Sequence, residues 1–419
     1  MTVSQGATWT IAALAVAGVI ARPWRLPEAV WAVLGASTLV AFSLLPAHDA
    51  VDAITRGSDV YLFLAGMMLL GEIARSEGLF DWLAALAARF ARGSGERLFT
   101  LVYVVGTVTT VFLSNDATAV VLTPAVYAAA RAAGAKPLPY LYACAFIANA
   151  ASFVLPISNP ANLVVFGRDL PPLVEWLTRF AIPSAVAVGA TYVALRLAMR
   201  DALRQPIVPE VALPQLPRGA VVAAIGIGVA GFVLLVASAL GAPLGVPTFL
   251  AGAATLAAVL LRRREGPWHI VRHVSWGVLP LVAGLFVLVA ALEQSGALQL
   301  LARALNALLE QPALAAVWLA GCVVGIVCNL MNNLPAALVA GTAASVANTP
   351  VHVKSALLIG VDLGPNLSVT GSLATILWLN ALRREGVHVG GWAFLRVGCV
   401  VMPPALLLAL AAVLLTPSA

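Results

Sequence analysis

Two stretches of the sequence lie 218 positions apart and resemble each other, and each places an asparagine in a polar break within an apolar run. The first reads FLSNDATAVV around Asn115, and the second reads NLMNNLPAALV around Asn333. The same offset superposes identical residues elsewhere: Ala65-Gly66 with Ala283-Gly284, Gly78 with Gly296, and Val105 with Val323. Related halves that meet at polar breaks are typical of secondary transporters with a site at the repeat interface.

The composition indicates a membrane protein. Hydrophobic residues make up 61% of the chain and charged residues 10%, whereas about a quarter of a soluble domain is charged. The first apolar segment, residues 7–21, lacks the basic start and the cleavage site of a signal peptide, so we interpret it as a membrane span. The net charge of +6 does not indicate nucleic-acid binding, because the basic residues lie in short loops between apolar segments.

Apolar runs of about 20 residues, the length that crosses the hydrocarbon, predict about ten transmembrane helices. They lie near residues 7–22, 28–46, 59–76, 140–167, 174–197, 218–239, 246–262, 273–292, 352–380 and 391–416. Two further segments, about 98–133 and about 312–347, are interrupted near their middles by the repeated asparagine, which predicts re-entrant helical hairpins. The amphipathic stretches before them, 79–90 and 298–308, are interpreted as interfacial helices, with ordinary loops as the alternative.

Five crossings in each half require the second half to be inserted upside down. With the N-terminus outside, 18 of the 24 Lys and Arg residues fall in inner loops, as the positive-inside rule expects. The six outside are Arg56, Arg168, Arg179, Arg303, Lys354 and Arg396. The sequence therefore predicts an all-α polytopic membrane protein with both termini outside. Two inverted-topology repeats, residues 1–200 and 218–419, are joined by a cytoplasmic linker at 201–217.

Four polar breaks at membrane depth, residues 114–118, 156–162, 329–335 and 362–372, are the candidate site. Unwound backbone at that depth is tolerated only where it is buried in protein or lines a cavity, and prolines within these breaks stop the helices. The predicted substrate-binding residues offer hydrogen-bond donors and acceptors: Ser114, Asn115, Asp116, Thr118, Ser158, Asn159, Asn332, Asn333, Asn366, Thr370, Gly371 and Ser372. Asn149 lies away from the breaks and is interpreted as a helix-packing residue.

Two acids, Asp116 and Asp362, lie at the predicted midplane. An ionisable side chain at that depth is a candidate functional group, so we predict that both couple transport to protons. The alternative is that each caps a helix.

The motifs resemble a known group of carriers. SNDATAVVLTP resembles the hairpin signature of the ion transporter superfamily, and MNNLPAALV followed by DLGPNLSVTGSLATILWLNAL resembles the arsenite efflux permeases of bacterial arsenical pumps. The likeness covers almost the whole chain. It implies proton-coupled export of arsenite and antimonite across the bacterial inner membrane, with a soluble ATPase subunit as an optional partner. This chain has Asn366 where such permeases tend to have a basic residue, which leaves the role of a positive charge there open.

The predicted site suits arsenite, which near neutral pH is mainly an uncharged trihydroxide. A dicarboxylate would need compensating positive charge, and no Lys or Arg lies inside the four breaks. Sodium coupling stays an alternative, because amide and carbonyl oxygens also bind sodium. The four cysteines are interpreted as packing residues: Cys144, Cys322, Cys328 and Cys399. No metal-ligand spacing occurs among them, so no structural metal is expected.

The sequence does not favour an enzyme. It contains no GxxxxGK[ST] loop, no GxGxxG after a strand and no GxSxG motif, so we expect no cofactor and no ATP hydrolysis by this chain. Two other functions stay open: a sodium- or proton-coupled carrier of another small anion, and a passive channel. The matched hairpins favour a carrier that works by alternating access over a channel.

Overall fold

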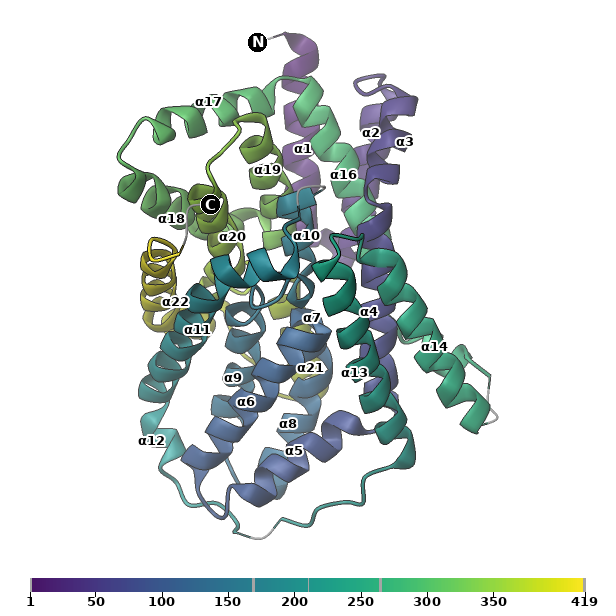
Figure 1. Cartoon of the computed structure of the whole chain (residues 1–419), viewed down its shortest axis with the longest axis vertical. Helices are drawn as coiled ribbons and strands as arrows, with labels where there is room; N and C mark the ends of the chain where they lie inside the picture. Colours follow the sequence, from purple (N-terminus) through teal and green to yellow (C-terminus); the bar gives the residue numbers. More distant parts are fainter. Residues whose placement is uncertain (1, 168–169, 210, 264–265, 417–419) are drawn as a thin grey trace.

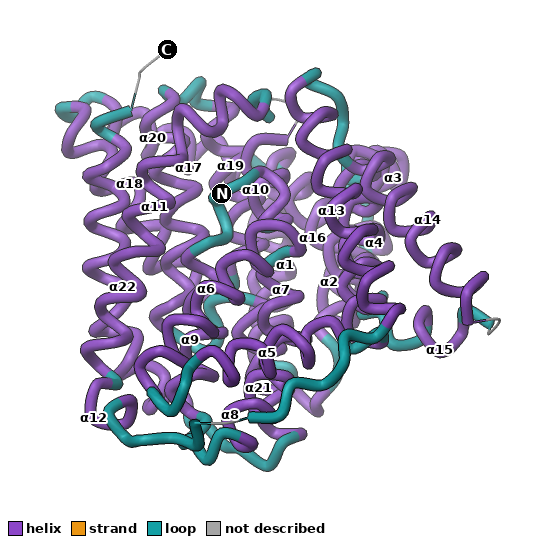
Figure 2. The backbone as a smooth tube through the Cα atoms, turned by 60° about the horizontal axis from the view of Figure 1, so that its bottom comes forward, coloured by secondary structure: helices purple, strands orange, loops and turns teal. Residues whose placement is uncertain are grey.

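The computed structural model describes residues 2–167, 170–209, 211–263 and 266–416 of the chain. Within these ranges every regular element is a helix, apart from one isolated bridge between Ser94 and Pro206 (Figures 1 and 2). Arg168 and Arg264, which the charge count includes, lie outside the described residues. The chain is therefore an all-α, multi-pass membrane protein, as the sequence predicted.

The first half begins with a pair of helices and ends in a long one. Its elements are α1 (Val3–Ala21), η1 (Pro23–Arg25), α2 (Glu28–Ala41), α3 (Ala47–Arg56), α4 (Ser58–Ser76), α5 (Leu79–Phe90), α6 (Gly95–Leu113), α7 (Asn115–Ala117), η2 (Thr118–Leu122), α8 (Thr123–Ala132), α9 (Leu138–Ala150), η3 (Pro156–Ser158), α10 (Pro160–Phe166), α11 (Leu173–Ala198) and α12 (Arg200–Leu203). The span expected at 28–46 ends at Ala41, and the separate helix α3 follows Pro46. Ser43 has a positive φ of 53°, which is not helical, and Pro46 then immediately precedes the first turn of α3.

The second half follows a similar order. Its elements are α13 (Arg218–Ala239), α14 (Gly245–Arg263), α15 (Trp268–Val271), α16 (Val278–Gln294), α17 (Ala297–Leu309), α18 (Ala313–Met331), α19 (Asn333–Val346), α20 (Val351–Leu363), η5 (Gly364–Leu367), α21 (Leu373–Arg384) and α22 (Gly391–Val413). The matched residues Gly78 and Gly296 both have positive φ, 75° and 85°, and each precedes an amphipathic helix, α5 or α17. In Figure 1, α5 lies at the lower end of the molecule and α17 at the upper end.

The chain turns back at both repeated asparagines. After α6 it reverses at Ser114, so that α8 returns to pack on α5; after α18 it reverses at Asn332, so that α19 returns to pack on α17. The Thr110 and Thr118 hydroxyls share a 2.8 Å hydrogen bond across the first hairpin. In the returning arm, Pro124 cannot donate to the carbonyl of Val120, and the adjacent segment η2 adopts the wider π-helical form.

Seven of the described helices are long and apolar enough to cross a membrane, or up to nine if each of two bent pairs is one span. The hairpin arms α6 and α18 are among the seven, with 19 residues each. The spans expected near 140–167 and 352–380 are each divided into two helices by a break, η3 in the first and η5 in the second. The exact number of crossings and the inverted relation of the halves stay predictions.

Candidate functional site

Each hairpin tip holds a non-glycine residue in an unusual backbone conformation. Ser114 has φ 105° and ψ 161°, and Asn332, its counterpart at the 218-residue offset, has φ 72° and ψ 153°. The repeated asparagines come next: Asn115 begins α7 and Asn333 begins α19, and both are buried. Positive φ at two matched non-glycine positions costs conformational energy, and such strain concentrates at functional sites.

Hydroxyl groups tie each helix break to the neighbouring hairpin in the same way. Ser158 Oγ donates to the carbonyl of Val111 at 3.0 Å, and Thr370 Oγ1 donates to the carbonyl of Asn329 at 2.9 Å. Val111 and Asn329 are 218 positions apart, each three residues before its hairpin tip. The two predicted site residues Ser158 and Thr370 therefore occupy equivalent places, which their spacing in the sequence does not reveal.

The breaks of the two halves meet through side-chain amides. Asn159 Nδ2 donates to Asp362 Oδ1 at 2.6 Å, and Asp362 has no exposed surface. Its second oxygen, Oδ2, is buried and accepts no hydrogen bond from the described residues. An unpartnered buried carboxylate oxygen is expensive, and the Ser152 side chain also interacts with this carboxyl.

A second amide bridge links the halves beside the first. Asn149 Nδ2 donates to Asn366 Oδ1 at 3.0 Å, and Asn366 Nδ2 donates to the carbonyl of Phe146 at 3.1 Å. Asn366 thus uses both ends of its amide on the first half. Asn149, interpreted from the sequence as a helix-packing residue, does join helices, and it joins the two halves.

The second half contributes a cluster of polar groups that is partly exposed. Asn329 Oδ1 accepts from Ser368 Oγ at 2.8 Å, and the hydroxyls of Ser368 and Thr370 are 3.1 Å apart. Asn332 Nδ2 approaches the carbonyl of Thr370 at 3.4 Å. Asn329 and Ser368 were not among the predicted site residues, although Asn329 lies in the same break, one helical turn before Asn333.

Three further predicted site residues contribute to helix packing or capping in the structure. Thr118 is fully buried inside the first hairpin. Ser372 caps α21 by accepting from the backbone N–H of Thr375 at 3.0 Å. At Gly371 an added Cβ would lie 2.7 Å from Asn329 Oδ1, so the chain passes close to the polar cluster there.

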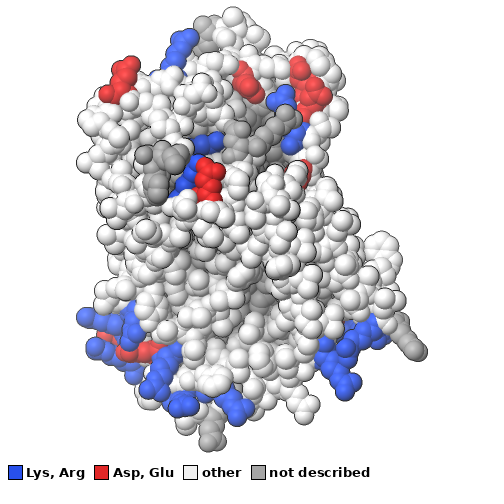
Figure 3. Space-filling view, viewed as in Figure 1, with Lys and Arg blue, Asp and Glu red and all other residues white. Residues whose placement is uncertain are grey.

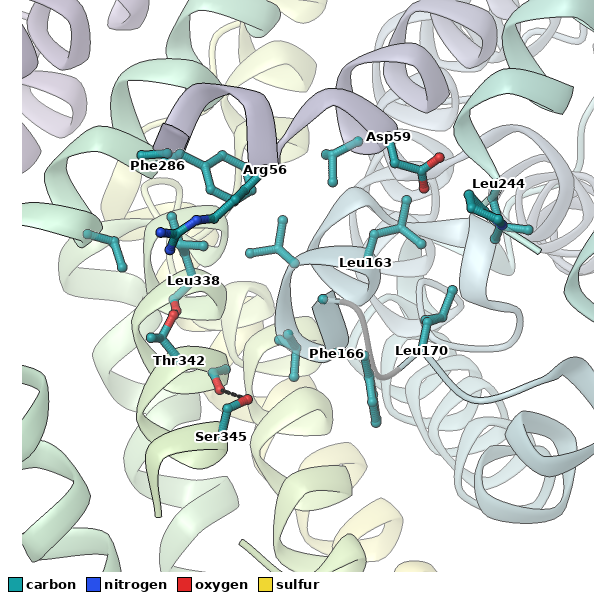
Figure 4. Close-up of a pocket in the computed structure, with 18 of the residues that line it drawn as sticks. Arg56, Asp59, Leu163, Phe166, Leu170, Leu244, Phe286, Leu338, Thr342 and Ser345 are labelled. Atoms are coloured by element: carbon teal, nitrogen blue, oxygen red, sulfur yellow. Dashed lines mark hydrogen bonds between the residues drawn. The ribbon is translucent and has the colours of Figure 1, made fainter. Parts of the chain in front are cut away.

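A large cavity of about 900 Å³ is lined by α10 just after the break at 156–162 (Figure 4). It is lined by α3, α4, α10, α16, α19 and the end of α13 with the residues after it, and Arg56 and Asp59 lie on one side and Thr342 and Ser345 on the other. The Arg56 side chain extends across it toward Leu338 (Figure 4).

A small cavity of about 70 Å³ contains Asp116. Ser114 and Pro160 line it near the hairpin tip, and Glu72 and His273 line it too. Neither of the last two was predicted from the sequence as a site residue.

The chain is similar in sequence to a known family and to several named proteins. The sequence profile of the CitMHS family, described as citrate transporters, matches residues 13–360, most of the chain. The chain belongs to the CitMHS family. Among the relatives of this chain, an arsenical pump membrane protein of Yersinia enterocolitica is 28% identical to it over 83% of the chain and 84% of the relative. One of Escherichia coli is 29% identical over the same shares. The expected resemblance to arsenical pump permeases is thus confirmed.

Other relatives extend the likeness. An uncharacterized transporter of Mycobacterium tuberculosis is 28% identical over 93% of this chain and 94% of that relative. Among solved structures, the YdaH transporter of Alcanivorax borkumensis superposes with a TM-score of 0.58 at 17% identity, over 87% and 86% of the two chains. The MtrF efflux pump of Neisseria gonorrhoeae superposes with a TM-score of 0.51 at 14% identity, over 87% and 82%. At these identities the structures support the fold alone.

Proposed function

We propose that this protein exports arsenite and antimonite from the bacterial cytoplasm in exchange for protons, by alternating access across the inner membrane. The observation on which this rests most is the buried pair of Asn159 and Asp362, one residue from each half, with a carboxylate oxygen left unpartnered. A group that joins the two halves and can take up a proton is suited to couple proton binding to a rearrangement of the halves. The relatives named as arsenical pump membrane proteins support the substrate.

The side chains of the breaks suit a small neutral hydroxide. The half-exposed cluster of Asn329, Ser368 and Thr370 presents hydroxyl and amide groups at hydrogen-bond distance from one another. Arsenite hydroxyls both donate and accept, so they can replace these internal bonds at little cost. Citrate, after which the family is described, carries several negative charges, and the breaks contain no Lys or Arg to balance them.

Coupling follows if protons and arsenite compete for the same carboxylates. An ionised Asp116 or Asp362 accepts hydrogen bonds from arsenite hydroxyls. Protonation from the outside removes that acceptor and releases arsenite there. The proton then leaves to the cytoplasm in the inward-facing state and restores the acceptor. Export is driven by the proton gradient if the empty, ionised carrier crosses slowly.

The test is arsenite accumulation in everted membrane vesicles with an imposed acidic interior and no ATP. Wild type should accumulate arsenite and lose it when a protonophore collapses the gradient. Asp116→Asn and Asp362→Asn should lose accumulation, because an amide cannot exchange a proton, while Asp201→Asn, on an exposed side chain of α12, should behave as wild type. Omitting ATP also tests whether a soluble ATPase subunit is required.

A second candidate function, carriage of a small anion, is favoured by Arg56 in the large cavity. Its guanidinium would attract an anion, against the opposing charges of Asp59 and Glu293 in the same lining. Citrate accumulation in the same vesicles, driven by sodium or protons, with no arsenite accumulation, would replace the arsenite proposal. Arsenite movement that only ever runs downhill would indicate a channel instead.

A further inference from the structure

The two cavities lie one after the other along α3 and α4, which are bent by 47° at the break between them. Arg56 and Val60 line the large cavity, and Leu64, Met68 and Glu72 line the small one. Along α4, residues spaced by four lie on the same side of a helix. The cavities also share α10, where Leu163 lines the large cavity and Pro160 the small one. On α4 and on α10, the nearest lining residues of the two cavities are one helical turn apart, ~5.4 Å along the helix axis.

The small cavity is lined by Asp116 and by a buried acid, Glu72. Glu72 is 7% exposed, near the opposite end of α4 from the large cavity, and it forms an ion pair with Arg75. The Arg75 side chain is 43% exposed, so Glu72 lies between the cavity and a solvated cation. Asp116 lines the same cavity from the hairpin tip.

His273 lines the small cavity and is itself exposed. Its Nδ1 lies 2.6 Å from the carbonyl of His269. A carbonyl can only accept, so Nδ1 bears the hydrogen and Nε2 is left to take up a proton. A titratable group is therefore present at the exposed part of the cavity as well as inside it.

We propose that Glu72 relays the proton between Asp116 and the cytoplasmic side through the small cavity, with His273 at its mouth. This rests on the proposed proton coupling and adds the route and the relay residue. In the step, Asp116 gives its proton to the Glu72 carboxylate, directly or along water in the cavity. Glu72 then passes it to His273 or to bulk water, and both acids end ionised. Arg75 stabilises the ionised Glu72 after each release.

The charged groups around Glu72 are consistent with this role. Arg75 also interacts with Asp81 of α5, so its charge is shared between two acids. The nearby buried acid Glu77 is different, because it pairs with Arg263 of α14 at 2.9 Å and does not line the cavity. Glu77 is therefore a matched control: a buried, ion-paired acid on the same end of α4, away from the path.

The experiment compares Glu72→Gln with Glu77→Gln in everted vesicles, by two measurements. The first is arsenite accumulation driven by an acidic interior. The second is exchange of labelled for unlabelled arsenite without a pH gradient, which needs substrate binding but no net proton transfer. Glu72→Gln should lose accumulation and keep exchange at the wild-type rate. Glu77→Gln should keep both per molecule inserted, and Glu72→Asp, which retains an acid, should keep accumulation.

Accumulation by Glu72→Gln equal to that of Glu77→Gln would overturn the relay, as would loss of exchange together with accumulation. If Glu72→Gln is not inserted because Arg75 is left unpaired, the double variant Glu72→Gln, Arg75→Gln removes the imbalance and is read by the same criteria. A wild type that exchanges arsenite but never accumulates it would overturn the proposed proton coupling, and this inference with it.

Discussion

The Asn159 amide and the Asp362 carboxylate are held 2.6 Å apart with almost no exposed surface. A buried charge without a partner is strongly disfavoured, so each of these side chains depends on the other. Because they belong to different halves, their hydrogen bond also fixes how the two helix breaks meet. The same pair therefore contributes to stability and, in the proposed cycle, to coupling.

Replacing Asn159 with Ala should destabilise the protein, because Asp362 then loses the donor to Oδ1 while Oδ2 already lacks one. We expect a loss of ~1–3 kcal/mol, measured as a lower melting temperature in detergent. Adding Asp362→Asn should recover part of the loss, since the buried group is then neutral. Asn306→Ala, at an exposed position of α17, is the control and should leave the melting temperature unchanged. An unaltered melting temperature in Asn159→Ala would show that the pair adds nothing to stability.

The sequence predicted only some of the contacts between site side chains. Asn115 and Asn333 were identifiable because the repeat matches them. The equivalence of Ser158 and Thr370 was not, because these residues are 212 rather than 218 positions apart. Glu72 gave no signal either: it lies inside an apolar span beside Arg75 and reads as an ordinary helical ion pair. Its place beside Asp116 depends on how distant helices pack.

Two pairs of helices pack closely through the repeated glycines. A Cβ added to Gly66 of α4 would lie 2.4 Å from the carbonyl oxygen of Thr248 in α14. One added to Gly284 of α16 would lie 2.7 Å from the backbone of Ala32 in α2. Close approach of backbones through small residues is a common basis of helix association in membranes. The residues matched at the 218-residue offset thus include glycines at close helix contacts as well as the hairpin tips.

Gly66→Ala and Gly284→Ala should therefore destabilise the fold, since the new methyl groups meet backbone atoms that cannot rotate away. We expect ~1–3 kcal/mol from overpacking, visible as lower melting temperatures and less inserted protein. Gly189→Ala is the control, because nothing lies within 4 Å of the added Cβ in α11 and alanine favours a helix over glycine. Equal behaviour of all three variants would mean that α4 and α16 can move away from their neighbours.

The two hairpins and the amphipathic helices α5 and α17 before them could be predicted from the sequence, because an apolar stripe and a polar tip are local patterns. That these two helices lie at the membrane interface stays a prediction. The sequence did not predict how the linker contacts the rest of the fold. The linker expected at 201–217 begins with a short helix, α12, and its backbone is held to the base of the first hairpin: Ile207 N–H donates to Gly93 O and Val208 N–H to Ala133 O. These contacts join residues 114 and 75 positions apart (207 − 93 and 208 − 133), and composition gives no sign of them.

The charge distribution distinguishes the two ends of the whole molecule. In the view of Figure 3, basic side chains gather at the lower end with acidic atoms among them at the left, while acidic and basic side chains are more evenly mixed toward the upper end. The lower end is also where the linker between the halves runs (Figure 1). The positive-inside rule predicts that the basic end faces the cytoplasm. The proposed cycle requires the exposed mouth of the small cavity to lie on that side.

This orientation can be tested by the reactivity of single cysteines. Gln205 lies in the linker and Gln311 lies between α17 and α18, and both are exposed. The native cysteines must first be replaced by Ser or Ala, because Cys399 is exposed. Since we interpret all four as packing residues, the cysteine-free protein should still transport. In that background Gln205→Cys should react with an impermeant thiol reagent only in everted vesicles. Gln311→Cys should react only in intact cells or right-side-out vesicles, with the parent cysteine-free protein as the unlabelled control. Labelling of both from the same side would exclude the inverted arrangement of the halves and, with it, alternating access about their shared breaks.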